Sequence, residues 1–359
     1  MRPDSTHGHS MKTAVAVSGG MDSLLALALM RAGGHEVLAV HGRFLPSGPD
    51  SDKAIAGLAE ACARLGVPLH VADLRREFER EVVAPFADAY RQGRTPNPCA
   101  VCNPRMKFGA LFRFALSLGA DALATGHYAR LEERGPSGLL LTRGGDPDKD
   151  QSYFLSLVPI ETLRRAHFPL GDICKRDVPE TLAGLGLTPP LPGESQEICF
   201  VPGDDYQTFL TRRGNMPGTG PIRLEDGTVI GRHKGLWRHT QGQRRGLGIA
   251  WTEPLYVLDK RVADNTLIVG PKPSLHAPGC VAWQVNFMTD PAGWPEVVML
   301  QTRYRQRARP ARFAVDGSRL VFHFIEEHTR PAPGQVAAVY DEAGAVLGGG
   351  VIEHALERP

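Results

Sequence analysis

Serines, glycines and an aspartate near the N-terminus are spaced in a way that can bind phosphate. The segment Ser18-Gly19-Gly20-Met21-Asp22-Ser23 follows the apolar run 13–17 and precedes the nearly all-apolar run 24–30. A strand, a tight glycine turn and a helix in this order present backbone N–H groups and the positive helix end to an anion. Because the segment has no lysine, it is not the G-x-x-x-x-G-K-S/T loop of kinases and GTPases. The alternative is a plain strand-to-helix turn with Ser or Asp as the N-cap.

Three of the six cysteines stand in settings that suit reactive thiols. Cys99 and Cys102 are spaced C-x-x-C, and Pro96 and Pro98 restrict the backbone that presents them. Cys199 follows far downstream, in Ser-Gln-Glu-Ile-Cys-Phe. In a chain without a secretory signal, such a pair indicates metal or redox chemistry and not a disulfide framework. The other three have no partner motif and are expected to be small core residues: Cys62, Cys174 and Cys280.

Alternating strands and helices are predicted to position these groups. Strands are expected at 13–17, 36–40, 69–74 and 121–125, and helices at 24–30, 52–65 and 75–90. Such alternation predicts an α/β domain with a doubly wound parallel sheet. After about residue 200, short β-branched runs between Gly and Pro favour small β-barrels or sandwiches. These runs are 228–230, 256–258, 266–269, 297–300, 320–325, 336–340 and 346–352.

Length and composition describe a globular protein of more than one domain. At 359 residues the chain exceeds a single core, and we expect domains at 11–205, 206–275 and 276–359. No apolar run approaches the roughly 20 residues of a membrane helix, so a soluble, cytoplasmic protein is expected. Residues 1–10 do not resemble a signal peptide, and Met11 offers a second start.

A formal charge of +2 excludes no partner, since an RNA-binding protein can concentrate positive charge on one face. One basic run would share a face of a single strand, although a solvated face is the alternative. It comprises Arg303, Arg305, Arg307, Arg309 and Arg312. A second basic region, also assigned to RNA, comprises Arg232, His233, Lys234, Arg238, Arg244 and Arg245.

The glycine loop resembles the pyrophosphatase loop of enzymes that split ATP into AMP and pyrophosphate. In such loops hydroxyl groups hold phosphate, and the acidic residue, here Asp22, helps to place Mg²⁺. Further segments resemble the tRNA-specific 2-thiouridylases, in the order of that family. They are 124–130, 149–154, 242–248, 302–306 and 333–335, and with the loop they extend over residues 13 to about 354.

The resemblance implies 2-thiolation of the wobble uridine in tRNA anticodons. ATP would adenylate the C2 oxygen, and sulfur from a cysteine persulfide would then displace AMP. Cys199 would carry the persulfide, and Cys102 would assist its release through a transient disulfide. The implied fold is an adenine nucleotide alpha-hydrolase-like domain, a small central domain and a C-terminal β-barrel that binds tRNA. Lys, Glu and Gln tRNAs are the implied substrates, with a persulfide-donating sulfur carrier or a cysteine desulfurase as partner; we expect a monomer.

The resemblance also assigns binding residues. For ATP they are Ala16, Val17, Ser18, Gly19, Gly20, Met21, Asp22, Ser23, Gly42 and Gly126. The target base would meet Asn97, Pro98 and Cys99. Other tRNA contacts would come from His127, Lys149, Asp150, Gln151, Arg303, Tyr304 and Gln335. Residues 41–44 lack the Met-Lys-Asn-Trp-like stretch common in the family, which leaves the adenine contacts open.

Cys99 departs from the pattern, because many family members carry aspartate there. A thiol with a reference pKa near 8.5 cannot act as a resting carboxylate. Other tRNA-thiolating enzymes hold a 4Fe-4S cluster with three cysteines, and Cys99, Cys102 and Cys199 suit that arrangement too. The persulfide and cluster mechanisms both stay open at this point.

Two other functions compete. The glycine loop alone would permit an ATP-dependent ligase of a small substrate, such as an amidating synthetase, but that enzyme needs neither the three cysteines nor the basic β-rich tail. A non-catalytic RNA-binding or zinc module would use Cys99 and Cys102 as ligands. It leaves Asp22 unexplained, and no fourth ligand is evident.

Overall fold

The computed structural model describes residues 11–134, 138–191, 198–201, 203 and 205–357. By their internal contacts these residues form two compact units. The first unit comprises Met1–Phe78, Asn103–Ser152 and Ile160–Glu194, and the second comprises Glu79–Cys102, Tyr153–Pro159 and Ser195–Pro359. The glycine loop therefore belongs to the first unit, and Cys99, Cys102 and Cys199 belong to the second. The three domain ranges expected from the sequence stay a proposal.

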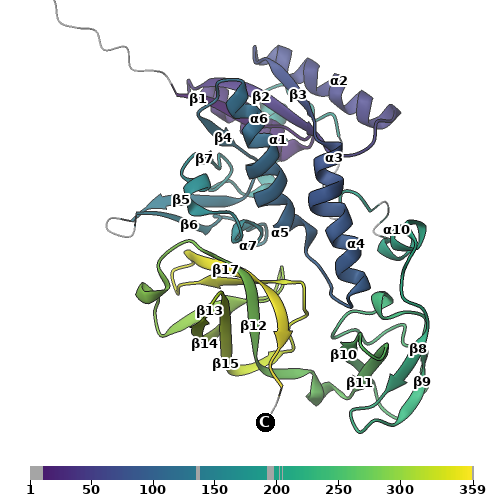
Figure 1. The fold of residues 1–359 in the computed structure, drawn as a ribbon. Helices are drawn as coiled ribbons and strands as arrows, with labels where there is room; N and C mark the ends of the chain where they lie inside the picture. The colour runs from purple at the N-terminus through teal and green to yellow at the C-terminus, as the bar shows by residue number, and fades with distance from the viewer. Residues whose placement is uncertain (1–10, 135–137, 192–197, 202, 204, 358–359) are drawn as a thin grey trace, which may run out of the picture. The chain divides into compact units, whose positions relative to one another are not determined.

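A five-stranded parallel sheet with the order β3-β2-β1-β4-β7 organises the first unit (Figure 1). Its strands are β1 (Lys12–Ala16), β2 (Glu36–Arg43), β3 (Leu69–Asp73), β4 (Ala122–Ala124) and β7 (Ala166–His167). The chain moves outward from β1 to β3 and then returns to β4 on the other side of β1. This reversal creates a switch point at the carboxyl ends of β1 and β4, which is where α/β sheets bind ligands. The predicted doubly wound parallel sheet is confirmed.

Helices follow the strands, as the alternation predicts. The first unit contains α1 (Met21–Ala32), α2 (Pro49–Arg64), α3 (Arg75–Phe78), the π-helix η2 (Asn103–Leu111), α6 (Phe112–Ser117), α8 (Ile160–Leu163), η4 (Lys175–Asp177) and α9 (Val178–Gly184). An antiparallel pair, β5 (Ala129–Glu133) and β6 (Leu139–Arg143), completes it. Leu27 of α1 and Leu58 of α2 pack on Val15 and Ala39 of the sheet, and Cys62 lies buried in the same cluster. The apolar spacing that predicted these elements thus forms their core.

The predicted helix at 75–90 is interrupted. The π-helix η1 (Glu79–Val83) separates α3 from α4 (Ala84–Arg91). Pro85 stands in the first turn of α4, where its missing N–H removes a bond to the preceding turn. The second unit also contains α5 (Pro98–Cys102) and α10 (Tyr206–Arg213), while α7 (Ser152–Leu155) lies at the unit boundary.

Two β-structures fill the rest of the second unit, as predicted for residues after about 200. A four-stranded sheet has the order β10-β11-β8-β9, and a closed barrel has the order β12-β15-β14-β13-β16-β17. The sheet consists of β8 (Gly220–Arg223), β9 (Val229–His233), β10 (Tyr256–Arg261) and β11 (Thr266–Gly270). The barrel consists of β12 (His276–Phe287), β13 (Val297–Gln301), β14 (Arg309–Asp316), β15 (Arg319–Thr329), β16 (Val336–Tyr340) and β17 (Val346–Ala355). Cys280 is buried in the barrel core, as expected of a packing residue.

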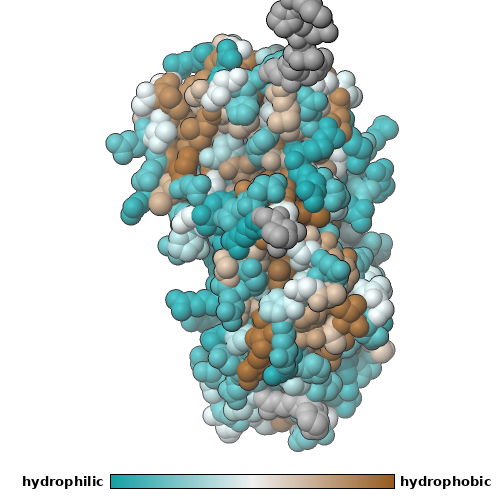
Figure 2. All heavy atoms as spheres, turned by 90° about the vertical axis from the view of Figure 1, so that its left-hand side faces the viewer, coloured by the Kyte–Doolittle hydropathy of each residue, from teal (hydrophilic) through white to brown (hydrophobic). Residues whose placement is uncertain are grey.

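Helix α10 was not expected in this β-rich region. Its N-cap is Asp205, whose Oδ1 accepts a hydrogen bond from the Thr208 backbone at 2.9 Å. On the face shown in Figure 2, hydrophilic and hydrophobic residues are interspersed. Within the described ranges, no helix has the length and hydropathy needed to cross a membrane.

Candidate active site

The glycine loop is a closed turn between β1 and α1. Gly19 has a φ of +96°, a left-handed conformation that favours glycine. The Ser23 hydroxyl accepts a hydrogen bond from the Ser18 N–H and donates one to the Gly20 carbonyl, both at 3.0 Å. The loop is therefore held from within, at the N-terminus of a 12-residue helix. This geometry suits phosphate, because backbone dipoles and the helix end supply positive potential.

Asp22 lies in the first turn of α1 and binds two groups from distant parts of the first unit. Its Oδ1 accepts hydrogen bonds from the Tyr128 hydroxyl at 2.7 Å and from Lys175 Nζ at 2.5 Å. Only 11% of the Lys175 side chain is exposed. The glycine loop has no lysine of its own, and η4 brings one to it. The sequence gives no local signal for this contact, since 153 positions separate the two residues.

Gly126, predicted to contact nucleotide, lies against the start of α1. A Cβ at this position would stand 2.8 Å from the Asp22 carbonyl carbon and 2.9 Å from the Ser23 nitrogen. Both are backbone atoms, so they cannot rotate away. Gly126 lies two residues after the end of β4, and its lack of a side chain allows this segment to lie against the backbone at the start of α1.

Replacing Gly126 with alanine should therefore displace the glycine loop. We expect ATP affinity to fall at least about tenfold, because misplaced N–H groups lose their hydrogen bonds to phosphate. Calorimetric titration with ATP measures the change. Gly184→Ala is the matched control, since a Cβ there meets nothing within 4 Å. Equal ATP affinity in the two variants would contradict this role of Gly126.

His127 is buried, with 5% of its surface exposed. Lys107 Nζ lies 3.3 Å from Nε2, and Thr125 Oγ1 lies 2.7 Å from Nδ1. Burial, with a smaller contribution from Lys107, holds the His127 pKa well below its usual range. Because an ammonium only donates, the neutral ring must accept at Nε2 and donate from Nδ1 to Thr125. The ring thus fixes the chain next to Gly126, and its direct contact with tRNA stays a prediction.

Residues 149–151, also predicted to contact tRNA, form a folded turn. Asp150 is buried and accepts hydrogen bonds from Arg143, from the Gly144 N–H and from Ser152. Gln151 Oε1 accepts the Tyr128 N–H at 3.1 Å. The segment therefore supports Tyr128, which contacts Asp22. Tyr128 and Lys175 are residues that the sequence did not identify.

In the second unit, the loop that leads to Cys99 and Cys102 is tied to residues 333–335. Thr95 N–H donates to the Pro333 carbonyl at 2.8 Å, and Asn97 N–H donates to the Gly334 carbonyl at 3.2 Å. Gln335 Nε2 donates to the Thr95 carbonyl at 2.8 Å. Gln335 is predicted to bind tRNA, and in the structure its side chain positions the cysteine loop. Its contact with tRNA stays a prediction.

Asn97 starts the short helix that carries both thiols. Its Oδ1 accepts the Ala100 N–H at 3.1 Å, which caps α5. Pro98 is buried, Cys99 is exposed and Cys102 is partly exposed. The expected contacts of Asn97, Pro98 and Cys99 with the target base stay predictions.

Cys199 is exposed in a turn closed by the Val201 N–H and the Ile198 carbonyl at 2.8 Å. The next residue, Phe200, packs edge-on against Phe86 of α4, with ring centroids 5.1 Å apart. Helix α4 leads directly to the cysteine loop, so the second unit carries all three thiols on connected supports. Residues 195–197 of the motif lie outside the described ranges. Among described residues, no group of three His, Cys, Asp or Glu side chains could hold a metal ion.

Lys260 of β10 holds the cysteine loop from another side. Its Nζ donates to Thr95 Oγ1 at 3.2 Å and to the His239 carbonyl at 2.9 Å, with 8% of the residue exposed. Burial lowers the pKa of Lys260 to about 7, and the negative charge of Asp259 raises it by a smaller amount. Folded protein then binds fewer protons than unfolded protein between pH 7 and about 10.4, so this lysine makes stability rise with pH there.

Comparison with Lys260→Met tests this linkage. The free energy of unfolding of the wild type minus that of the variant should increase between pH 7 and pH 9.5. An increase of a few kcal/mol is expected, because each pH unit contributes up to about 1.4 kcal/mol. Chemical denaturation at several pH values measures it, and the subtraction removes the other titrating groups. A difference that stays constant over this interval would contradict the lowered pKa.

The prediction of one basic strand over residues 303–312 is wrong. Strand β13 ends at Gln301 and β14 begins at Arg309, and Arg305 in the turn between them has a φ of +64°. A hydrogen bond of 3.0 Å from Thr302 Oγ1 to Gln306 Oε1 spans the turn. Arg309 and Arg312 are three positions apart in β14, so they face opposite sides.

The other residues that were predicted to contact RNA divide into packed and exposed ones. Tyr304 packs on Phe154, with ring centroids 4.3 Å apart. In the second basic region His233 is buried, and it lies within hydrogen-bonding distance of Asn265 and Gly235. Four members remain exposed: Arg232, Lys234, Arg244 and Arg245.

Comparisons with known proteins agree with these features. Family models described as a tRNA methyl transferase HUP domain, a tRNA methyl transferase PRC-barrel domain and an aminomethyltransferase beta-barrel domain match residues 11–203, 207–271 and 278–352. The protein named tRNA-specific 2-thiouridylase MnmA of Nitratidesulfovibrio vulgaris (strain Miyazaki F) is 54% identical over 95% of this chain and 99% of its own. The protein of the same name from Lawsonia intracellularis is 46% identical over 96% of this chain and 100% of its own.

A solved 4-thiouridine synthetase–RNA complex with bound ATP matches 57% of this chain and 51% of its own, at 16% identity and a TM-score of 0.35. This similarity is too low to assign a family. The sequence identities of 54% and 46% over nearly the whole chain do assign one, and they agree with the family segments in the sequence. The chain belongs to the tRNA-specific 2-thiouridylase family.

Proposed function

We propose that this chain uses ATP and a persulfide to replace the C2 oxygen of the wobble uridine in tRNA with sulfur. The observation that carries the proposal is the 54% identity, over 95% of the chain, to a relative named tRNA-specific 2-thiouridylase. The geometry supports it, because the first unit holds a phosphate loop and the second presents three thiols. A ligase of small substrates would need the loop alone.

The first step is activation of the base. The uridine C2 oxygen attacks the α-phosphorus of ATP, and pyrophosphate leaves. The glycine loop holds the leaving phosphates through backbone N–H groups, and Lys175, buried beside Asp22, offsets their negative charge. A nucleotide-bound Mg²⁺ uses one or two carboxylates together with phosphate oxygens. Asp22 at the N-terminus of α1 fits this role, and the ion would stabilise charge on the phosphates.

The second step is sulfur transfer. The terminal sulfur of a persulfide on Cys199 attacks C2, and the C–O bond to AMP breaks. The Cys102 thiolate then attacks the Cys199 sulfur, which leaves sulfur on C2 and forms a Cys102–Cys199 disulfide. A thiol reductant restores both cysteines. Exposure of Cys199 supports delivery of sulfur from a separate persulfide-donating protein. Substrate tRNAs for Lys, Glu and Gln, a cytoplasmic location and a monomeric state belong to the same proposal.

A 4Fe-4S cluster is the competing sulfur route. It needs three thiolates around one centre. Among the described residues no group of three His, Cys, Asp or Glu side chains could hold a single metal ion, but the thiolates of a cluster bind different irons and lie farther apart. The exposure of Cys199 suits delivery of sulfur by a persulfide donor, and the persulfide route is the one we propose.

Purification without oxygen tests this choice. The persulfide route predicts a colourless protein with neither iron nor acid-labile sulfide that still thiolates tRNA when a persulfide donor is added. About four iron atoms per chain, with activity that disappears when iron is removed, would contradict it.

A further inference from the structure

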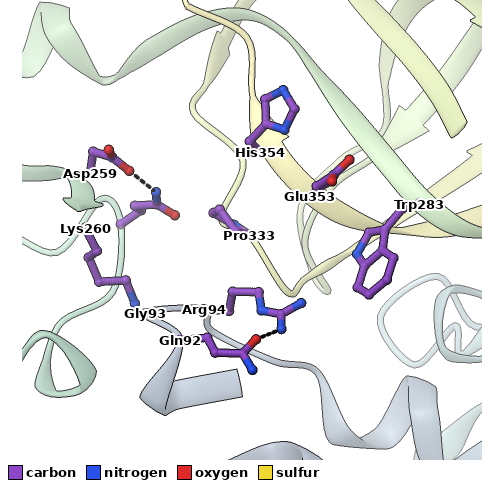
Figure 3. Close-up of a pocket in the computed structure, with 10 residues that line it drawn as sticks. Gln92, Gly93, Arg94, Asp259, Lys260, Trp283, Pro333, Glu353 and His354 are labelled. Atoms are coloured by element: carbon purple, nitrogen blue, oxygen red, sulfur yellow. Dashed lines mark hydrogen bonds between the residues drawn. The ribbon is translucent and has the colours of Figure 1, made fainter. Parts of the chain in front are cut away.

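The second unit contains a cavity of about 440 Å³ that no step of the proposed reaction uses (Figure 3). Three parts of the unit line it: residues 92–94 after α4, residues of the four-stranded sheet, and residues of the barrel. Arg94 on its wall directly precedes Thr95, which Lys260 and Gln335 fix in place. The cavity therefore adjoins the loop that is predicted to meet the target base. Its volume lies in the range of small-ligand sites.

Two buried polar atoms in the cavity wall have no hydrogen-bonding partner among the described residues. Gln241 is 8% exposed, and its Nε2 donates to Asp259 Oδ1 at 3.3 Å, the dashed line at Asp259 in Figure 3. Its Oε1 accepts no hydrogen bond, and Trp283 Nε1 donates none. Such groups cost free energy when buried, so each indicates a missing partner. The wall offers one acceptor and one donor.

The charges around the cavity are largely balanced. Glu353 accepts two hydrogen bonds from Arg319, at 2.7 and 3.0 Å, which compensate its carboxylate. Asp259 adjoins Lys260, whose pKa of about 7 leaves it only partly charged. The Arg94 guanidinium lies 5.8 Å from the centroid of the Trp283 ring and adds a planar surface. A ligand for this site is neutral and flat, with a donor and an acceptor on its edge.

We propose that this cavity binds an unpaired nucleobase of the RNA substrate, separate from the uridine that is modified. Nucleobases have these properties, and proteins bind unpaired ones by stacking on aromatic or guanidinium planes and by hydrogen bonds to their edges. The base edge donates to Gln241 Oε1 and accepts from Trp283 Nε1, while Arg94 covers its face. A base held here fixes the RNA beside the cysteine loop. The inference rests on the proposed action on tRNA and deepens it.

Binding of an anticodon hairpin RNA to the full-length protein, without ATP or sulfur donor, tests the inference. Loop nucleotides are replaced one at a time by abasic residues, and dissociation constants are measured by fluorescence anisotropy. Trp283→Phe keeps an aromatic ring but removes the donor, and Gln241→Met removes the acceptor at similar size. Trp251→Phe, a change at an exposed tryptophan outside the cavity, is the matched control. Melting curves verify that each variant is folded.

We expect each cavity variant to weaken binding of the intact hairpin about tenfold, and the control to leave it unchanged. At one abasic position the wild type should bind the hairpin about tenfold more weakly than it binds the intact hairpin. The cavity variants should bind this abasic hairpin no more weakly than they bind the intact one, because the base that they fail to hold is already missing. If the effects of a cavity substitution and an abasic replacement on RNA affinity multiplied at every position of the loop, the inference would be overturned. Variants that bind RNA normally but bind the sulfur-donating protein weakly would also overturn it. A wild type that binds RNA yet forms no 2-thiouridine when ATP and a persulfide donor are then added would instead refute the proposed function.

Discussion

Replacing Cys199 with serine should abolish tRNA thiolation, by at least about 10³-fold, and should leave ATP binding within about twofold. A serine hydroxyl group cannot carry the terminal sulfur of a persulfide, and it offers Cys102 no sulfur atom to attack. The glycine loop belongs to the other unit and keeps its geometry. Mass spectrometry of nucleosides from digested tRNA measures 2-thiouridine, and calorimetry measures ATP affinity. Pyrophosphate release should continue, because activation of the uridine precedes sulfur attack, whereas AMP should stay bound to the uridine C2 oxygen.

Cys174→Ser is the matched control for this experiment. Cys174 is partly exposed but belongs to the first unit and has no part in the proposed transfer. It should retain the wild-type rate of 2-thiouridine formation. Unchanged thiolation by Cys199→Ser would remove Cys199 as the sulfur carrier, and equal losses in both variants would indicate general damage to the fold.

Replacing Asp22 with asparagine should stop the activation step. An amide oxygen can still accept the Tyr128 and Lys175 hydrogen bonds, so the loop should stay folded. The lost negative charge leaves the buried Lys175 ammonium uncompensated and removes the carboxylate that places Mg²⁺. We expect tRNA-dependent pyrophosphate release to fall about 10²- to 10³-fold. Loading of Cys199 with sulfur by a persulfide donor should be normal.

Asp172→Asn controls for loss of a carboxylate elsewhere in the first unit. Its side chain is 81% exposed and pairs with Arg130. Pyrophosphate release by this variant should equal that of the wild type. If Asp22→Asn also released pyrophosphate at the wild-type rate, Asp22 would have no role in activation. Together, the Cys199 and Asp22 variants separate the two half-reactions, because each should block one and spare the other.

Local features of the site were predictable from the sequence, because their signals lie within a few residues. The apolar run, the two glycines and the helix that follow each other over 13–30 predicted the phosphate loop and its position after β1. The absence of any partner motif predicted the burial of Cys62 and Cys280 correctly, but the same prediction was wrong for Cys174, which is partly exposed. The prediction of the loop between a strand and a helix needed only the periodicity of these two elements.

The long-range features could not be predicted in this way. The contacts of Lys175 and Tyr128 with Asp22 join residues 153 and 106 positions apart, so only the folded sheet brings them together. Gln335 carries no sign in the sequence that it binds the Thr95 backbone. The cavity could not be predicted either, because its wall is formed by segments that are far apart in the sequence.

The error at residues 303–312 has a local physical cause. Alternating arginines suggested a strand, but the turn spanned by Thr302 and Gln306 interrupts it, with Arg305 in a left-handed conformation. Arginines at alternate positions therefore do not by themselves predict a β-strand. A side-chain hydrogen bond within a turn offers the backbone an alternative to the sheet.

The most direct measurement combines purified protein, ATP, a persulfide donor and tRNA that lacks sulfur at the wobble uridine. Nucleosides and nucleotides are then quantified in the same reaction. We predict that 2-thiouridine forms at the wobble position, with one AMP and one pyrophosphate released for each sulfur transferred, and that neither appears without tRNA. AMP release without tRNA, or tRNA that contains no 2-thiouridine after ATP is consumed, would contradict the proposed activity.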